Sequence, residues 1–137
     1  MSLNNFSTDL FSVTVNGRII SDWGETATPY TSQPIDPSSV IRRGQGSNAV
    51  ALDRLNPGES VSLFLNPGSP DSSFLKGLQN SRATITMSTV QIGTLESSVG
   101  TEGRIVNKGP RGRGCMTITD DQYDFEFNTW TELAGGS

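Results

Sequence analysis

The sequence contains no histidine and a single cysteine, Cys115. Without histidine the chain cannot build a Ser-His-Asp or Cys-His catalytic centre, and it lacks a common zinc ligand and general base. A single cysteine excludes an internal disulfide, so the chain is unlike a small secreted domain stapled by disulfides. We therefore expect no enzymatic activity, no cofactor and no metal ion.

Long apolar segments are also missing. No stretch approaches the roughly 18 apolar residues of a membrane span. The first residues lack the basic-then-apolar order of a signal peptide, so we expect no membrane contact and a cytoplasmic place of synthesis. The net charge of −4 argues against tight binding to nucleic acid, although an acidic surface suits nucleic acid that slides past it.

The 137 residues have the size of one domain. Even with its 15 glycines added to a hydrophobic fraction of 33%, the apolar share lies just below that of typical globular domains. A thin core suits a two-layer β protein, or a subunit that completes its burial against copies of itself. We predict a single β domain over 1–137, with an N-terminal arm at 1–7 and a flexible tail at 132–137.

A strand–helix–strand segment organises the rest of the chain. Residues 59–65 alternate between apolar and polar side chains, which indicates a half-buried strand. Ser69 and Pro70 are typical of a helix start, and the spacing of the apolar residues that follow predicts one short helix at about 70–80. This helix must lie on a sheet, for which the two flanking strands are the obvious candidates. In the second of them, a phase change predicts a bulge near Ser88 and Thr89.

The remaining segments read as short strands and turns. Asn16-Gly17 is a strong hairpin signal between two strands. Residues 24–39 form a long loop or irregular extended segment, and residues 95–103 a turn. Further strands are expected at 9–15, 18–23, 40–43, 48–55, from residue 82 onward, and at the aromatic 123–127. The pattern predicts an antiparallel β-sandwich or barrel with one flanking helix.

Two groups of charged residues are candidate sites. The turn KGPRGRG carries Lys108, Arg111 and Arg113, which we expect to be solvated or to meet an acidic surface on a neighbouring subunit rather than phosphate. The acidic residues near the C-terminus lack EF-hand spacing. Strand alternation places Asp124 and Glu126 on one wet face, which matters if that face lines a channel.

Three motifs together resemble the tail tube proteins of contractile-tailed bacteriophages. They are the hairpin TVNGRII, the strand–helix step ESVSLFLNPGSPDSSFLKGLQ and the last strand YDFEFNTW. The resemblance implies a β-sandwich or barrel subunit, six copies of which form a ring, with rings stacked into a tube. DNA would pass through the lumen without specific binding, and the tape-measure protein would be held there.

The resemblance further implies a place in the virion tail, assembled in the host cytoplasm. The expected partners are the sheath, baseplate and neck proteins. Contacts between subunits are expected at Phe6, Tyr30, Ile35, Arg42, Arg43, Lys108, Arg111 and Arg113. A lumen-facing acidic surface is expected at Asp120, Asp124 and Glu126.

Two alternatives stay open. A glycan- or receptor-binding β-sandwich of a virion or adhesin would expose Trp23, Tyr30 and Trp130 as a platform. The tube of a phage-derived bacteriocin would obey the same physics as a phage tail tube.

Overall fold

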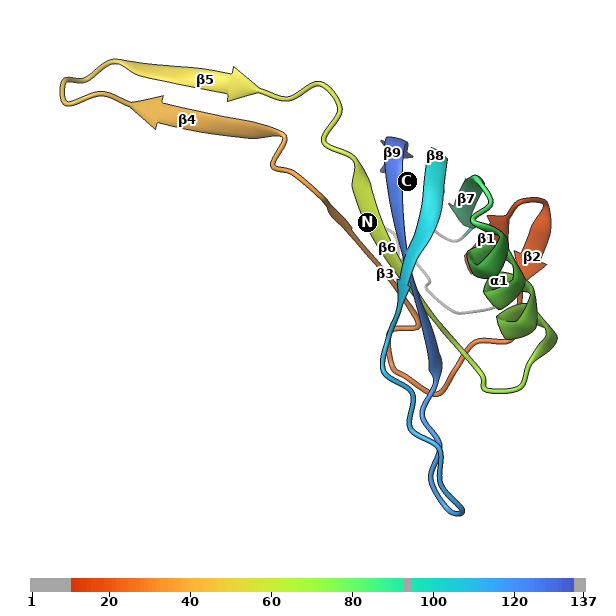
Figure 1. Cartoon of the computed structure of the whole chain (residues 1–137). Helices are drawn as coiled ribbons and strands as arrows, with labels where there is room; N and C mark the ends of the chain where they lie inside the picture. The colour runs from red at the N-terminus through yellow and green to blue at the C-terminus, as the bar shows by residue number, and fades with distance from the viewer. Residues whose placement is uncertain (1–10, 93–94, 135–137) are drawn as a thin grey trace, which may run out of the picture.

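The computed structural model describes residues 11–92 and 95–134, which form a mainly β protein with antiparallel strands and one helix. The predicted fold class is therefore confirmed. Seven strands form one sheet in the order β2-β1-β7-β8-β9-β6-β3, and β4 and β5 form a separate ribbon (Figure 1). The bounds are β1 Phe11–Val15, β2 Arg18–Ile20, β3 Tyr30–Pro34, β4 Ser39–Arg43, β5 Ala49–Asp53, β6 Glu59–Leu65, α1 Pro70–Ser81, β7 Ile85–Gln91, β8 Glu96–Lys108 and β9 Asp121–Leu133.

The predicted N-terminal hairpin is present. Asn16 and Gly17 both have positive φ, 48° and 87°, as a tight two-residue hairpin turn requires. The side chain of Asn16 also accepts a hydrogen bond from the Thr86 amide at 2.7 Å and donates one to the Thr84 carbonyl at 3.2 Å. The turn thereby fixes β1 against the start of β7.

The sheet curls strongly without closing into a barrel. At one end, the chain leaving edge strand β2 reaches the other side of the sheet, where Trp23 forms a bridge to Leu65 of β6. At the other end, the ring of Phe11 on β1 lies 5.0 Å from that of Tyr30 on the opposite edge strand β3. In place of a two-sheet sandwich or a closed barrel, the structure has one curled sheet whose two edges approach each other.

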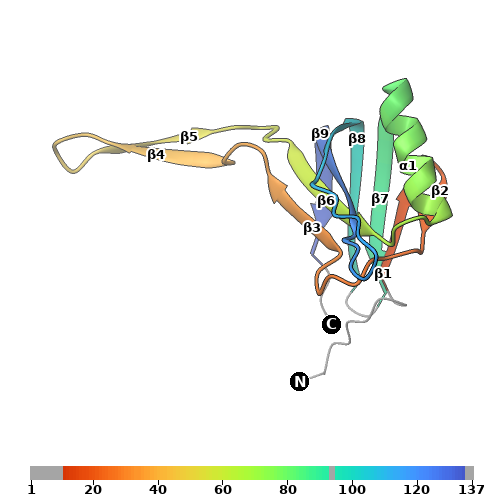
Figure 2. The same cartoon turned by 60° about the horizontal axis from the view of Figure 1, so that its bottom comes forward.

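Helix α1 covers part of the opening of this curl (Figure 2). The hydroxyl of Ser69 accepts a hydrogen bond from the Ser72 amide at 3.2 Å, which caps the helix, and Pro70 occupies the first turn. The strands that precede and follow the helix, β6 and β7, are not neighbours, because β8 and β9 lie between them. The helix therefore faces a wider sheet than the sequence suggested.

The core lies on the concave side of the sheet. Alternate residues of β6 and β9 point inward, and the two strands pair in register, with Val61 opposite Phe125 and Leu63 opposite Tyr123. The buried apolar residues are Val13, Val15, Ile20, Val61, Leu63, Leu65, Leu75, Ile85, Met87, Tyr123, Phe125 and Phe127.

The predicted turn at 95–103 was wrong, because β8 runs through most of it. Its inward positions there include Ser98, Gly100 and Gly103, so the strand has no apolar periodicity to detect. A Cβ atom on Gly100 or Gly103 would overlap the rings that fill this space, those of Phe127 and Trp130. Large aromatic residues on β9 thus require small residues on β8.

The predicted bulge near Ser88 and Thr89 was also wrong. β7 keeps one phase to its end, with Thr89 buried and Val90 exposed, and its register shift against β8 lies between Ile85 and Met87. The expected long loop at 24–39 contains strand β3. The last strand, β9, ends at Leu133, two residues into the predicted tail, and the arm at 1–7 lies outside the described residues.

Candidate interaction surfaces

The β4–β5 hairpin projects away from the sheet, and every residue of both strands is exposed (Figure 1). Val40 lies opposite Leu52, and Arg42 lies opposite Val50. Residues two apart in a strand point to the same side, so these two pairs share one face of the ribbon. Val50 and Leu52 expose 57% and 53% of their surface. An isolated two-stranded hairpin is marginally stable in water, and its exposed apolar side chains make this face a candidate interaction surface.

The root of the hairpin is held by the chain itself. The Ser39 hydroxyl donates to the Asp53 carboxylate at 2.6 Å, and Arg54 lies 3.6 Å from Asp36 in an exposed ion pair. Of the predicted subunit contacts, Ile35 lies at this root and Arg42 and Arg43 lie on β4, all exposed. These three residues therefore belong to one projecting element.

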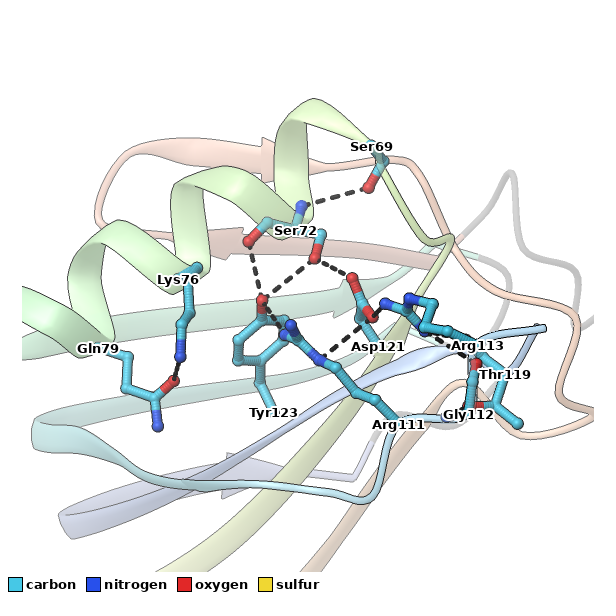
Figure 3. A network of polar contacts seen from close by, with 10 residues as sticks. All are labelled: Ser69, Ser72, Lys76, Gln79, Arg111, Gly112, Arg113, Thr119, Asp121 and Tyr123. Atoms are coloured by element: carbon cyan, nitrogen blue, oxygen red, sulfur yellow. Dashed lines mark hydrogen bonds and ion pairs between the residues drawn. The ribbon is translucent and has the colours of Figure 1, made fainter.

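Two arginines of the KGPRGRG turn converge on one carboxylate (Figure 3). Arg113 Nη2 lies 2.5 Å, and Arg111 Nε 3.3 Å, from the same oxygen of Asp121. Arg111 also donates to the Tyr123 hydroxyl at 2.8 Å. Arg111 and Arg113 thus contact a carboxylate of the same chain, and their contact with an acidic surface on a neighbouring subunit stays a prediction. Lys108 remains exposed at the end of β8.

Asp121 also connects this turn to the helix. The Ser72 hydroxyl donates to Asp121 at 2.5 Å, and Tyr123 donates to the Ser72 carbonyl at 3.0 Å. Burial opposes ionisation of Asp121, but hydrogen bonding by Ser72 and the two arginine charges outweigh it and lower the pKa of Asp121. The network joins α1, β9 and the basic turn (Figure 3).

A second buried carboxylate, Asp71, anchors the other side of the helix. It accepts hydrogen bonds from Arg18 at 2.7 Å and from the amides of Ser21 and Asp22 at 2.8 and 3.0 Å. Burial disfavours its charge, yet these donors outweigh burial and lower the pKa of Asp71. The guanidinium of Arg18 lies 5.3 Å from the Phe74 ring centre, adding a cation–π contact. The helix start is therefore fixed to β2 as well as to β9.

The three predicted lumen-facing acids do not lie together. Asp124 and Glu126 share the outward face of β9, where the Ser62 hydroxyl donates to Asp124 at 2.8 Å. Asp120 precedes β9 and accepts hydrogen bonds from the amides of Glu25 and Thr26 at 3.2 and 3.0 Å. Asp120 thus holds the loop after β2. The alternation of inward and outward residues along a strand could not predict this contact, because Asp120 lies outside the strand.

A buried glutamate, Glu59, beside the exposed Glu132 lies at the other end of the curl and was not predicted from the sequence. Glu59 begins β6 in the same inward phase as Val61, and burial together with the neighbouring Glu132 raises the pKa of Glu59 to about 7. The Trp130 indole donates to Glu132 at 2.7 Å. Burial also raises the pKa of nearby Tyr30, a predicted subunit contact whose ring packs on Phe11 within the chain. The alternation of residues 59–65 could have predicted that Glu59 points inward, because Glu59 is in phase with Val61, Leu63 and Leu65.

Within the described residues, no helix has the length and apolar character needed to cross a membrane. No group of three or more potential metal ligands was found in that part of the chain.

No protein-family model matches the chain, and no curated protein sequence matches it. Solved structures do. A chain in the sheath/tube terminator of an extracellular contractile injection system, PVC, has a TM-score of 0.67 at 10% identity, covering 98% of this chain and 100% of that chain. A chain of the PVC sheath-tube complex in the extended state has a TM-score of 0.60 at 13% identity, covering 95% and 92%.

A third match is a chain in the baseplate of the anti-feeding prophage, a structure described as six-fold symmetrised. Its TM-score is 0.59 at 12% identity, and 98% of each chain is covered. All three likenesses span nearly the whole of both chains. The chain therefore has the fold of components of contractile injection systems.

Proposed function

We propose that this protein is a structural subunit of the tube of a contractile, tail-like particle, in which six copies form a ring and rings stack. The observation that carries the proposal is the fold likeness to a chain of a sheath-tube complex, which extends over 95% of this chain. A particle part of this kind requires surfaces for self-association rather than a catalytic pocket.

The surface of the chain supports self-association. The apolar face of the β4–β5 hairpin is unpartnered within the described structure, and β2 and β3 leave two sheet edges. Strand edges and projecting ribbons are the elements through which β subunits join. We assign the hairpin to the contact with a neighbouring subunit, with Arg42 and Arg43 at that contact.

The outward face of β9 is the proposed wall of the lumen. It presents Asp124 and Glu126 with the serines of β6 beside them, giving an acidic and hydrophilic surface. Such a face repels DNA weakly and lets it pass, and it also suits a tape-measure protein. Sheath, baseplate and neck proteins complete the proposed set of partners, in a virion tail assembled in the host cytoplasm.

The proposal includes both a phage tail and a phage-derived injection device, because the same ring geometry serves both. The glycan-binding alternative gains no support from the described structure. Trp23, Tyr30 and Trp130 are each packed against the core rather than gathered on a platform.

The experiment is to replace residues 40–52 by a short glycine–serine linker. Both strands of the hairpin are exposed, so the shortened protein should keep its fold and its melting temperature. Negative-stain electron microscopy should show rings or tubes for the wild type and none for the variant. Tubes formed by the variant would refute the role of the hairpin.

A further inference from the structure

A concavity of about 720 Å³ lies between α1 and the basic turn. Its wall includes Ser69, Ser73, Lys76 and Gly77 from the helix side, and Arg111 and Arg113 from the turn. Figure 3 shows Lys76 on the helix and the two arginines on the turn. It is a separate feature from the β4–β5 hairpin, which leaves the sheet at the opposite end of β6.

The concavity carries excess positive charge. Among its described lining residues are three cations, Lys76, Arg111 and Arg113, and one carboxylate, Asp121. Within residues 11–92 and 95–134, Lys76 donates only to the neutral amide of Gln79, at 3.4 Å. Arg111 Nε is buried without a well-directed hydrogen bond among the described residues. Two formal positive charges thus remain for an incoming group, in a chain whose net charge is −4.

Gly77 supplies an independent observation. A glycine inside a helix costs about 0.5–1 kcal/mol relative to alanine. Gly100 and Gly103 are required by rings of the same chain, but a Cβ atom on Gly77 would meet nothing of the described chain within 4 Å. Packing within the described subunit does not require this glycine, and the open space beside it leaves room for close approach of another chain.

We propose that this concavity is the acceptor site for carboxylate side chains of a second copy of the chain. The occupant follows from charge: a second copy is acidic overall, and it exposes carboxylates at the far end of the same strands. Asp36, Glu102 and Glu126 line a depression of about 430 Å³ there, and Arg54 is the one cation among its described lining residues, in an exposed ion pair with Asp36. The concavity with the basic turn lies at the end of the β6–β9 pair where Leu65 is opposite Asp121, which we call the basic end. The depression lies at the other end, where Glu59 is opposite Phe127, which we call the acidic end.

An acidic end that meets the basic end of the next copy is a heterologous contact, in which two different patches join. Contacts of this type build rings when the rotation closes and helical stacks when it does not. The inference rests on the proposed self-assembly and adds to it a site distinct from the β4–β5 hairpin.

The test compares the wild type with Gly77→Gln and Lys76→Gln, using Arg82→Gln as the control. Arg82 is an exposed arginine at the other end of α1, and it does not line the concavity. The side chain in Gly77→Gln fills the acceptor site yet has room in the monomer, so the melting temperature should hold or rise. The critical concentration for tube assembly, measured by sedimentation and negative-stain imaging, should rise about tenfold for Gly77→Gln and several-fold for Lys76→Gln.

The control variant should assemble like the wild type. If wild type, Gly77→Gln and Lys76→Gln all form tubes at the same concentration, the acceptor site is wrong and the proposed tube stands. Equal impairment of Arg82→Gln would also overturn the site, because the effect would then be one of general charge. A wild type that stays monomeric would overturn both the site and the tube.

Discussion

The hydroxyl of Ser72 lies 2.5 Å from a carboxylate oxygen of Asp121, joining the first turn of α1 to the first residue of β9. Both side chains are buried, and the same carboxylate receives Arg111 and Arg113 from the basic turn. One acidic residue thus joins helix α1 to the basic turn and β9, which lie about 40 to 50 residues further along the chain.

Ser72→Ala should destabilise the protein by about 1–2 kcal/mol, because it removes a buried hydrogen bond to a charged acceptor. Urea unfolding followed by circular dichroism measures the change. Ser73→Ala, at the exposed neighbouring position, is the matched control and should change stability by less than about 0.5 kcal/mol. Equal effects of the two substitutions would show that the Ser72–Asp121 contact contributes nothing.

Acid should weaken the two carboxylate anchors. Both Asp71 and Asp121 have a lowered pKa in the folded protein, so their stabilising contribution is present above the ordinary pKa of 3.8 and is lost as pH falls. The free energy of unfolding should therefore decrease from pH 5 to pH 3. Asp71→Asn should be less stable than the wild type at pH 6 and should show a shallower acid limb, and an unchanged acid limb would contradict the assignment.

Glu59 should make the free energy of unfolding decrease as pH rises, which is opposite to the effect of Asp71 and Asp121. Its pKa rises from 4.5 to about 7 on folding, so its protonated form stabilises the fold below pH 4.5, and this contribution is lost as pH rises through 7. Glu59→Gln does not titrate, so its stability relative to the wild type should increase by about 3 kcal/mol between pH 4.5 and pH 8. Chemical unfolding at several pH values measures this difference, and a constant difference would refute the raised pKa of Glu59.

Gly103→Ala should destabilise the protein by about 1–3 kcal/mol, because its methyl group would enter the space that the Phe127 ring occupies. Gly46→Ala is the control, since a Cβ atom there meets nothing of the described chain within 4 Å. Thermal unfolding of both variants measures the effect. Unchanged melting of Gly103→Ala would show that the strand and the ring separate easily.

The sequence predicted those elements that are specified by residues close together in the chain. Asn16-Gly17 predicted the first hairpin, Ser69-Pro70 predicted the helix start, and the alternating aromatics 123–127 predicted the core of β9. Each of these depends on residues within a few positions of one another, which a sequence displays directly.

Long-range relationships could not be predicted in the same way. The first part of β8, residues 96–103, was missed because its inward positions include Gly100 and Gly103, which leave space for the rings of Phe127 and Trp130 on another strand. The meeting of Ser72 with Asp121 spans 49 residues and depends on the strand order. Glu59 was detectable from its inward phase, but its pairing with Glu132 required the curl of the sheet.

The central claim is that copies of this chain join around a hollow axis. The most direct measurement is negative-stain electron microscopy of the purified wild-type protein across a range of concentration and salt. The account predicts rings with six-fold symmetry that stack into tubes. A single compact particle under every condition, with the mass of one chain by light scattering, would contradict it.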